Sequence, residues 1–221
     1  MNPRIHAFPP ILGSGPRVLI LGSMPSVESL KRGEYYGHPR NHFWQLMYRI
    51  FDAGEPPESY ERRVAFLERH GIAVWDVISD CIREGSLDQS IEEAAYRDIG
   101  VLLEEYPGIR LVAANGRRAH DGFWKALRLY GWIVGHATAA TLSRCRHIER
   151  FGITVCRLPS TSPIPTRHNK RMEDKVGEWK VVAQYAAGGP QGSGSRSENI
   201  SSERVSSAAE VKGSKKEEAQ G

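Results

Sequence analysis

Aromatic, imidazole and amide side chains are gathered in one short stretch of the chain, residues 35–44, with the sequence YYGHPRNHFW. This stretch follows a mainly apolar run, residues 17–21, which is β-branched at two positions and leads into Gly22 and Ser23. A short apolar run that stops at a glycine is typical of a buried parallel strand. In open α/β sheets, ligands bind beyond the carboxyl ends of the strands, so we expect this stretch to form part of a binding site.

Polar side chains also follow three further predicted strands. These strands cover residues 72–75, 110–114 and 153–158, and they end at Asp76, at Asn115-Gly116 and at Pro159-Ser160. Because the carboxyl ends of parallel strands meet at one edge of a sheet, the side chains at these ends should lie close together. We therefore expect a site built from residues 22–41, Asp76, Asn115 and residues 160–167.

Helical patterns lie between the strands and set the fold class. Residues 42–51 carry apolar side chains at positions 43, 46, 47 and 50, which is the spacing of one helix face. Further helices are predicted over residues 58–69, 96–105, 117–130 and 170–186. Strands that alternate with helices favour a parallel sheet covered on both faces. We predict an α/β fold, a three-layer αβα arrangement with a central, mostly parallel four-stranded sheet.

Three segments at these strand ends resemble motifs of the uracil-DNA glycosylase superfamily. The segments are GSMPS at 22–26, YGHPRNHFW at 36–44 and LPSTSP at 158–163. The segment at 36–44 is similar to the aromatic-x-His-Pro-x-Asn-x-Phe-Trp segment of the mismatch-specific glycosylases, and the likeness is greatest to the hypoxanthine-DNA (deoxyinosine) glycosylase branch. It extends over roughly residues 5–187. The resemblance implies a monofunctional DNA glycosylase, which flips a deaminated base and hydrolyses its N-glycosidic bond in base excision repair.

Asn41 is the candidate catalytic residue. Cleavage of the glycosidic bond passes through a sugar cation, and an amide carbonyl can orient the attacking water without carrying a charge. In the wider superfamily an Asp or Asn of the first motif does this, but the matching residue here is Met24, a poor hydrogen-bond acceptor. The resemblance to the hypoxanthine branch gives the role to Asn41. The alternative is that Asn41 only caps a helix that begins at His42.

The predicted base-binding residues are Tyr36, Asp76, Asn115, Gly22 and Ser23. By the resemblance, Tyr36 stacks on the flipped base, a contact worth roughly 1–3 kcal/mol; the alternative is an ordinary core tyrosine. Asp76 could accept the N1–H of hypoxanthine or the N3–H of uracil, or could be a turn or helix-capping residue. A charged carboxylate would repel the departing base anion unless it were protonated or paired. Asn115 could read a base edge, but the Asn-Gly pair favours a turn.

The predicted DNA-binding residues are His38, Ser160, Ser162, Ile164 and Arg167. In the second superfamily motif, small hydroxyls contact phosphates and an apolar side chain wedges into the duplex. The resemblance gives the hydroxyl roles to Ser160 and Ser162 and the wedge role to Ile164. Arg167 would suit an adjoining phosphate, and His38 would hold either the loop geometry or a phosphate. The alternative for the second motif is a proline-rich surface turn.

Metal and cofactor chemistry are not indicated by the sequence. No third ligand lies at a suitable spacing from His38 and His42. Leu158 stands where related enzymes often have a histidine before Pro-Ser, so imidazole help to the leaving base is missing. No amine nucleophile stands out, and we therefore expect no strand cleavage and no metal or organic cofactor.

Composition bounds the class of protein. The chain has 221 residues, 40% hydrophobic and 25% charged, as in soluble globular proteins. No apolar run approaches the ~20 residues of a membrane-spanning helix, and the N-terminus lacks a signal-peptide core. Cys81, Cys145 and Cys156 form no CxxC pair, so we expect reduced intracellular thiols without an iron–sulfur cluster. The expected location is cytoplasmic, or nuclear in a eukaryote.

The net charge of +4 belongs to residues 1–187, because five basic and five acidic residues cancel beyond them. A mild excess is compatible with phosphate contacts but does not demand them. Residues 188–221 are rich in Gly, Ser, Glu and Lys and lack aromatic residues, which predicts disorder. The predicted organisation is therefore a glycosylase-like catalytic domain, residues 1–187, and a disordered tail, residues 188–221.

The predicted partner is double-stranded or single-stranded DNA containing deaminated bases, bound by a monomer away from membranes. Two alternatives stay open: a uracil- or mismatch-specific DNA glycosylase, and a catalytically inactive DNA-binding member of the superfamily, favoured by Met24 and Leu158. A hydrolase of small nucleosides or nucleotides ranks lower. The turn at residues 22–25 lacks the Gly-Lys-Ser/Thr ending of a phosphate-binding loop.

Overall fold

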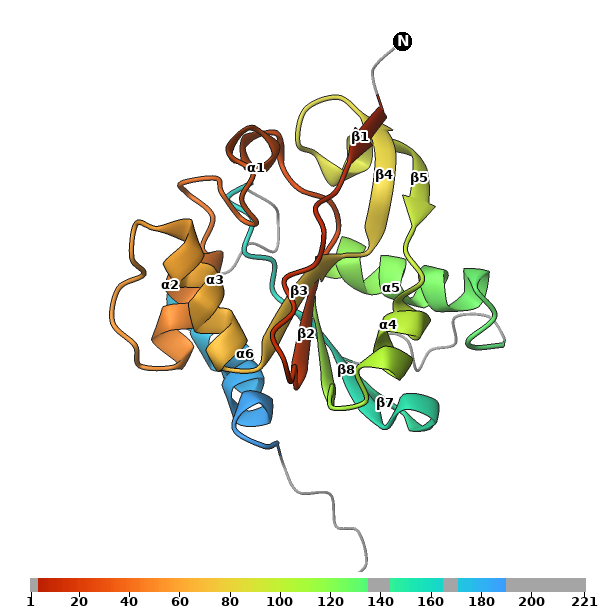
Figure 1. The fold of residues 1–221 in the computed structure, drawn as a ribbon. Helices are drawn as coiled ribbons and strands as arrows, with labels where there is room; N and C mark the ends of the chain where they lie inside the picture. The colour runs from red at the N-terminus through yellow and green to blue at the C-terminus, as the bar shows by residue number, and fades with distance from the viewer. Residues whose placement is uncertain (1–3, 135–143, 165–170, 190–221) are drawn as a thin grey trace, which may run out of the picture. The chain divides into compact units, whose positions relative to one another are not determined.

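The central feature of the computed structural model is a five-stranded sheet of order β3-β2-β6-β8-β7 (Figure 1). The structure describes residues 4–134, 144–164 and 171–189. The sheet strands are β2 (Val18–Gly22), β3 (Ile72–Asp76), β6 (Leu111–Asn115), β7 (Cys145–Ile148) and β8 (Ile153–Leu158). The four predicted strands pair in parallel, and β7 joins β8 as an antiparallel edge. The expected fold class is confirmed, but the four-strand count missed β7, whose first three residues are exposed and give no apolar pattern.

Helices cover both faces of this sheet (Figure 1). One face carries α2 (Phe43–Ile50), α3 (Tyr60–Arg69) and α6 (Met172–Ala186), and the other carries α4 (Ile99–Glu105) and α5 (Arg117–Leu129). Successive side chains of a strand point to opposite faces, so Ile20 packs in the first core and Leu21 in the second. The run of apolar residues in β2 is therefore explained by burial on both sides.

A second, antiparallel sheet was not predicted from the sequence. It consists of β1 (Arg4–His6), β4 (Ile78–Arg83) and β5 (Ile91–Tyr96), in the order β1-β4-β5. The helix predicted to start at Tyr96 starts instead at Ile99, because residues 91–96 form β5. A short helix, α1 (Val27–Arg32), was missed as well; Ser26 caps its first turn and Gly33 ends it.

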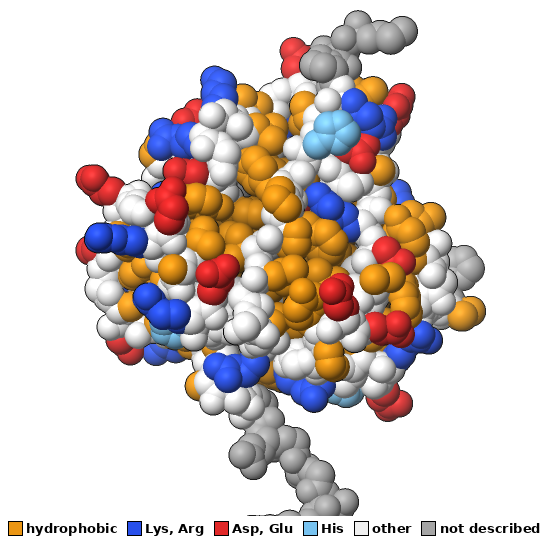
Figure 2. Space-filling view, viewed as in Figure 1, with side chains coloured by type: hydrophobic (Ala, Val, Ile, Leu, Met, Phe, Trp, Pro, Cys, Tyr) orange, Lys and Arg blue, Asp and Glu red, His pale blue; other side chains and the backbone are white. Residues whose placement is uncertain are grey.

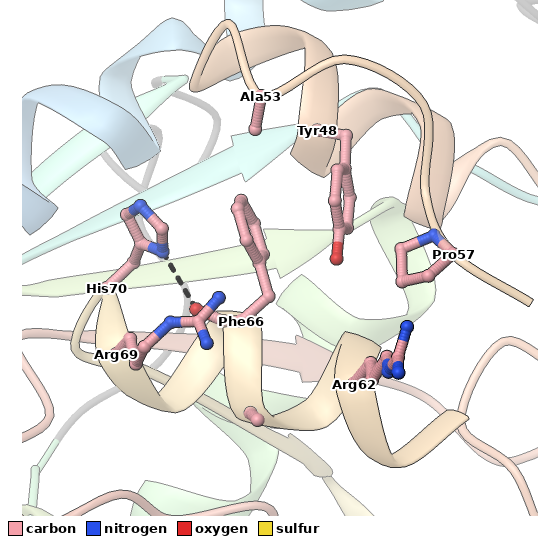
Figure 3. A pocket seen from close by; sticks show the side chains of 8 residues that line it. Tyr48, Ala53, Pro57, Arg62, Phe66, Arg69 and His70 are labelled. Atoms are coloured by element: carbon pink, nitrogen blue, oxygen red, sulfur yellow. Dashed lines mark hydrogen bonds between the residues drawn. The ribbon is translucent and has the colours of Figure 1, made fainter. Parts of the chain in front are cut away.

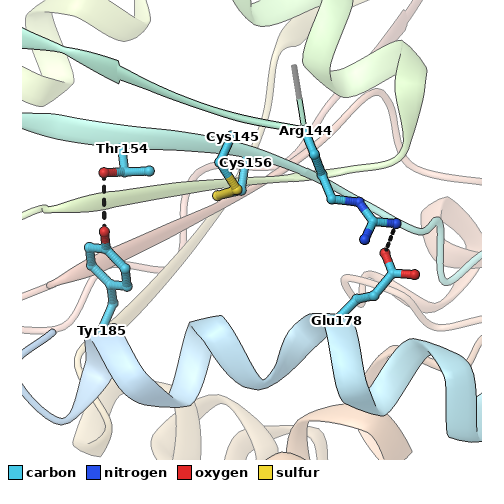
Figure 4. Close-up of a disulfide and its surroundings, with 6 residues drawn as sticks. All are labelled: Arg144, Cys145, Thr154, Cys156, Glu178 and Tyr185. Atoms are coloured by element: carbon cyan, nitrogen blue, oxygen red, sulfur yellow. Dashed lines mark hydrogen bonds and ion pairs between the residues drawn. A yellow bond between two sulfur atoms is a disulfide. The ribbon is translucent and has the colours of Figure 1, made fainter. Parts of the chain in front are cut away.

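The expectation of three reduced thiols is wrong for two of them. Cys145 and Cys156 lie directly opposite each other in the β7–β8 pair and form a disulfide (Figure 4). Cys81 is a free, buried thiol. Cys145 and Cys156 are 11 positions apart in the sequence, a spacing that matches no recognised motif. Only the hairpin register brings the two side chains together. Tyr185 and Glu178 of α6 contact the same hairpin, through Thr154 and Arg144 (Figure 4).

Two further expectations concern the whole chain. In the part of the chain that the structure describes, no helix has the length and apolar character needed to span a bilayer. Most of the predicted tail, residues 190–221, lies outside the described residues, so its disorder and the domain boundary at 187/188 stay predictions. Figure 2 shows acidic and basic side chains interspersed over one face of the protein, around a central apolar area.

Candidate active site

The carboxyl ends of β2 and β3 form the centre of the candidate site. Gly22 and Asp76 are paired in register at these two ends. A Cβ atom on Gly22 would lie 2.2 Å from the Asp76 Oδ1 atom and 3.4 Å from the Tyr36 hydroxyl. Any side chain at position 22 would therefore collide with the Asp76 carboxyl. Glycine is required here because the Tyr36 phenol and the Asp76 carboxyl converge on the backbone of the first strand.

The Asp76 carboxyl is buried and only partly satisfied. Its residue is 4% exposed, and Oδ2 has no hydrogen-bond partner among the described residues. Burial raises the pKa of Asp76 to about 7, against the opposing effect of the Arg97 and Arg83 guanidiniums and with a further rise from Asp88. A carboxyl with this pKa is neutral in about half of the molecules near neutral pH. This is the condition under which it would not repel a departing base anion.

Tyr36 has a backbone conformation that is rare for a residue with a side chain, with φ of +54°. One face of its ring stacks on Phe43, with ring centroids 3.8 Å apart and planes inclined by 21°. The hydroxyl is buried and makes no hydrogen bond of ordinary geometry to a described residue. Burial and the nearby Asp76 raise its pKa, whereas the nearby Asn115 side chain lowers it. A flipped base could stack only on the other ring face. The strained backbone and the orphaned hydroxyl distinguish Tyr36 from an ordinary core tyrosine.

The Asn41 side chain accepts a hydrogen bond from the first residue of α2, although the N-cap residue of the helix is His42, whose own side chain makes no capping hydrogen bond. The Asn41 Oδ1 accepts the bond from the Phe43 N–H at 3.0 Å, and the Asn41 N–H donates to the His38 carbonyl at 2.8 Å. The helix starts one residue later than predicted, at Phe43. An amide oxygen has two lone pairs, so the cap leaves one for a further donor such as water. Capping and a catalytic role are therefore compatible.

His38 stabilises the loop that carries Asn41. Its Nδ1 accepts a hydrogen bond from the Arg40 N–H at 3.1 Å, which supports the loop-holding interpretation. Arg40 itself is exposed and makes no ion pair with any described residue. The loop thus presents a cation beside the capping amide.

A buried lysine lies behind the same loop. Lys175 of α6 is fully buried, and its Nζ lies 3.1 Å from the Nδ1 of His42. Burial lowers the pKa of Lys175, and burial with the nearby Lys175 lowers that of His42. An ammonium only donates hydrogen bonds, so the Nδ1 of His42 is the acceptor in this pair when Lys175 is charged. One turn further along α6, Trp179 donates its indole N–H to the Pro159 carbonyl at 3.0 Å. The helix therefore contacts both site segments from behind.

Thr161 links these segments, and the sequence analysis did not identify it. The residue is fully buried. Its N–H donates to Asn115 Oδ1 and its Oγ1 accepts from Asn115 Nδ2, both at 2.9 Å. Its carbonyl accepts the His42 N–H at 3.0 Å. Asn115, the last residue of β6, therefore holds the Thr161 turn through both polar atoms of its side-chain amide. The turn conformation expected from the Asn-Gly pair is taken by Gly116, with φ of +94°.

The predicted phosphate and wedge residues follow in the same turn. Ser160 is exposed, and its Oγ accepts the Ser162 N–H at 3.2 Å. The Ser162 Oγ accepts the Ile164 N–H at 3.3 Å. Both hydroxyl protons stay available to a phosphate oxygen. Ile164 is half-buried, and Arg167 lies outside the described residues.

Ser23 contacts a segment that sequence reasoning left unassigned. Its hydroxyl donates to Asp88 Oδ1 at 2.8 Å, and Asp88 lies in the connection between β4 and β5. The second sheet therefore contributes a loop, residues 84–90, to the edge where the site lies. Met24, the residue after Ser23, is buried in the core, consistent with its exclusion as a water ligand.

Two other features lie apart from these residues. Among the described residues, no cluster of His, Cys, Asp or Glu could hold a metal ion. A pocket of about 540 Å³ lies between α2 and α3, with Tyr48 and Phe66 in its wall and Arg62, Arg69 and His70 around it (Figure 3). None of the predicted site residues lines this pocket.

Comparison with known proteins identifies the family of this chain and its relatives. The model of the Uracil DNA glycosylase superfamily matches residues 9–183. A protein named hypoxanthine DNA glycosylase, from Methanosarcina acetivorans, is 38% identical over 180 residues, which make up 81% of this chain and 98% of that protein. A protein of the same name from Methanosarcina barkeri is 34% identical over 127 residues, 58% of this chain and 80% of that one.

A solved structure gives the same result for the fold. It is the solution NMR structure of a Methanosarcina acetivorans protein provisionally identified as a uracil DNA glycosylase. The match has a TM-score of 0.62 and 31% sequence identity, and covers 83% of this chain and 99% of that one. The fold and site define a three-layer α/β protein with a buried carboxyl, an aromatic ring and a capping amide at the carboxyl edge of its sheet. The chain belongs to the uracil-DNA glycosylase superfamily.

Proposed function

We propose that this protein is a DNA-deoxyinosine (hypoxanthine-DNA) glycosylase, a hydrolase that removes a deaminated base and leaves an abasic site. The geometric observation that carries the proposal is the convergence of the Tyr36 ring and the buried Asp76 carboxyl on Gly22. The choice of hypoxanthine is supported by the relatives of that name, one of which is aligned over 98% of its length.

In this proposal Asp76 reads the base in its protonated form. A neutral carboxyl can donate its O–H and accept an N–H side by side, which matches the C6=O and N1–H edge of hypoxanthine. The raised pKa of Asp76, about 7, and its unpaired Oδ2 both support this role. When the C1′–N9 bond breaks, its electron pair stays on the base, and a hydrogen bond from the carboxyl to O6 stabilises that anion.

Asn41 would orient the water. Its second Oδ1 lone pair accepts a water proton, so that the water oxygen faces C1′ of the sugar cation. The new C1′–O bond completes hydrolysis, and the proton released from the water passes to the departing base or to solvent. Because the Asn41 cap fixes the amide rigidly, the water position would be set before the substrate binds.

DNA contacts in this proposal come from the turn that Thr161 anchors. The Ser160 and Ser162 hydroxyls donate to phosphates, and Ile164 occupies the space of the extruded base. The enzyme acts as a monomer on DNA inside the cell. Strand cleavage is not proposed, since Lys175, the lysine that the described residues place behind the site, is fully buried.

The experiment uses labelled duplexes that carry a single inosine or a single uracil, followed by heating in alkali to break the strand at abasic sites. Breaks at inosine and not at uracil are expected. Breaks at neither base, together with retained DNA binding, would support an inactive DNA-binding member instead. Strand breaks before the alkali step would contradict the monofunctional assignment.

A uracil- or mismatch-specific glycosylase is the second candidate, and it is favoured by the similar solved structure, which is named provisionally as a uracil DNA glycosylase. Uracil presents the same donor and acceptor pair, N3–H and C4=O, so the Asp76 carboxyl alone does not exclude it. Cleavage at uracil that equals or exceeds cleavage at inosine would establish this candidate.

A further inference from the structure

The loop between β4 and β5, residues 84–90, is fixed to the first strand end on both sides of one apolar residue. On one side the Ser86 Oγ accepts the Val27 N–H at 2.9 Å. On the other side Asp88 accepts the Ser23 hydroxyl at 2.8 Å. Between these two anchors stands Leu87, with extended backbone dihedrals and a carbonyl that accepts the Ser90 N–H. The position of Leu87 is therefore defined from the same segment, residues 23–27, that leaves the base-binding Gly22.

The Leu87 side chain points away from the core. It is 49% exposed, whereas its flanking residues hold hydrogen bonds to the site segment. Hydrogen bonds hold the loop on both sides of this leucine. Removing its apolar side chain from water by contact with a partner would lower the free energy. The next residue, Asp88, is hydrogen-bonded to Ser23, so the loop holds Leu87 near the edge of the sheet where the strand ends bring the candidate site.

The charges next to Leu87 limit what it can contact. Glu84 and Asp88 are exposed acids of the same loop. Arg83, just before the loop, is buried and donates to the Pro25 carbonyl, so its charge is not at the surface. These acids oppose contact with phosphates, so a favourable contact of this loop with DNA has to come from the apolar Leu87 side chain. Apolar side chains that meet base steps partly unstack them, as wedges do in many DNA-bending proteins.

We propose that Leu87 is a second wedge for double-stranded DNA, separate from Ile164, that enters the base stack beside the extruded nucleotide. Leu87 stands on the β4–β5 loop and Ile164 follows β8, so the two side chains would meet the duplex from different elements of the fold. This inference rests on the proposed function and specifies its substrate, a duplex in preference to a single strand. Removal of the wedge slows extrusion from a duplex, where the base must leave its partner and its stack.

The test compares Leu87→Ala with the unmodified protein on inosine in a duplex and in a single strand. We expect kcat/KM to fall by about tenfold on the duplex, because one buried leucine contact is lost. On the single strand it should fall by less than about twofold. Leu87→Met should restore most of the duplex activity, because it keeps an apolar side chain of similar length. The control is Leu129→Ala, whose leucine is 61% exposed at the end of α5 and should change neither substrate.

A second measurement needs no cleavage. The fluorescent base 2-aminopurine, placed next to inosine in the duplex, brightens when its stack opens. The unmodified protein and Leu129→Ala should raise this signal, and Leu87→Ala should not. Equal loss of activity on both substrates, or an unchanged fluorescence response, would overturn the role of Leu87. Absence of cleavage by the unmodified protein on every substrate would instead overturn the proposed function.

Discussion

At the scale of single residues, the main physical feature is a carboxyl that the fold keeps near its midpoint of ionisation. Asp76 lies at the end of a buried strand, beside a glycine that leaves room for it. Desolvation raises its pKa more than Arg97 and Arg83 lower it. A charged Asp76 would be in conflict with a departing base anion, because the two would repel each other. The buried environment resolves this conflict, because it favours the neutral form.

Asp76 should make the folded state less stable as the pH rises. The folded-state pKa, about 7, lies above the ordinary value of 3.8, so the folded protein holds a proton that the unfolded chain releases. This contribution is fully present below pH 3.8 and is lost as the pH passes 7. Asp76→Asn removes this titration, so its melting temperature should exceed that of the unmodified protein by a margin that grows with pH. We expect this margin to be roughly 5–10 °C larger at pH 8 than at pH 4.

Thermal denaturation at the two pH values measures this effect. Asp52→Asn is the matched control, because Asp52 is exposed and its φ of +51° suits asparagine. The same pH dependence in both variants would show that Asp76 is not the cause. A pH-independent difference for Asp76→Asn would mean that the carboxyl keeps one charge state throughout.

Replacement of Asn41 should separate its two roles. Asn41→Ala loses both the α2 cap and the water-binding oxygen, whereas Asn41→Ser keeps a capping oxygen on a shorter side chain. We expect turnover on inosine to fall at least about a hundredfold in both variants and DNA affinity to stay nearly constant. Only the alanine variant should lose about 1 kcal/mol of stability. Full turnover by Asn41→Ser would assign Asn41 to capping alone.

At the scale of elements, the site is assembled by contacts between segments far apart in the sequence. Thr161 joins the start of α2 to the end of β6 through three hydrogen bonds. α6 supports the start of α2 through Lys175 and the turn that holds Thr161 through Trp179, one helical turn further along. No single element holds the site, so its geometry depends on the packing of the helix layer against the sheet.

Thr161→Val should weaken this junction. The valine has the same shape but no hydroxyl, so the Asn115 Nδ2 loses its acceptor in a buried place. We expect a loss of about 1–3 kcal/mol in stability. The corresponding fall in melting temperature is roughly 2–10 °C. Thr161→Ser keeps the hydroxyl and serves as the control in the same denaturation experiment. A serine variant as unstable as the valine variant would show that the methyl group, not the hydrogen bond, matters at this position.

At the scale of the whole molecule, the charge is modest and the basic residues are not confined to one patch. The net charge is +4, and acids and bases alternate over the face in Figure 2. Two cations stand out at the site edge: Arg40 in the Asn41 loop and Arg118 in the first turn of α5, just after β6. Neither makes an ion pair with any described residue. Phosphate contacts should therefore depend on a few defined arginines.

DNA binding should weaken with salt, and each of these arginines should contribute to the slope. Arg118→Gln should reduce the slope of log affinity against log salt by about one, with similar losses for all sequences. Fluorescence anisotropy with a labelled duplex at several salt concentrations gives this slope. Arg62→Gln, at the pocket between α2 and α3, is the control and should leave the slope unchanged. A flat salt response of the unmodified protein would contradict a DNA partner.

Local patterns in the order of residues are sufficient to predict much of the fold and the place of the site. Apolar runs bounded by glycine or a polar residue located the four parallel strands, and helical periodicity located α2, α3, α5 and α6. The motif residues placed the site at the strand ends and indicated the family. These inferences succeeded because burial on two faces and helix periodicity leave direct signals in the order of residues.

Features that depend on which segments face each other are visible only in the folded chain. The second sheet has strands with mixed polarity, and β7 is largely exposed, so neither has a distinct apolar signal. The Cys145–Cys156 disulfide follows from hairpin register, and Thr161 owes its role to partners 46 and 119 positions away. The charge state of Asp76 belongs to this class too. Desolvation is set by the surrounding atoms, and no residue pattern records how completely the folded chain excludes water from one carboxyl.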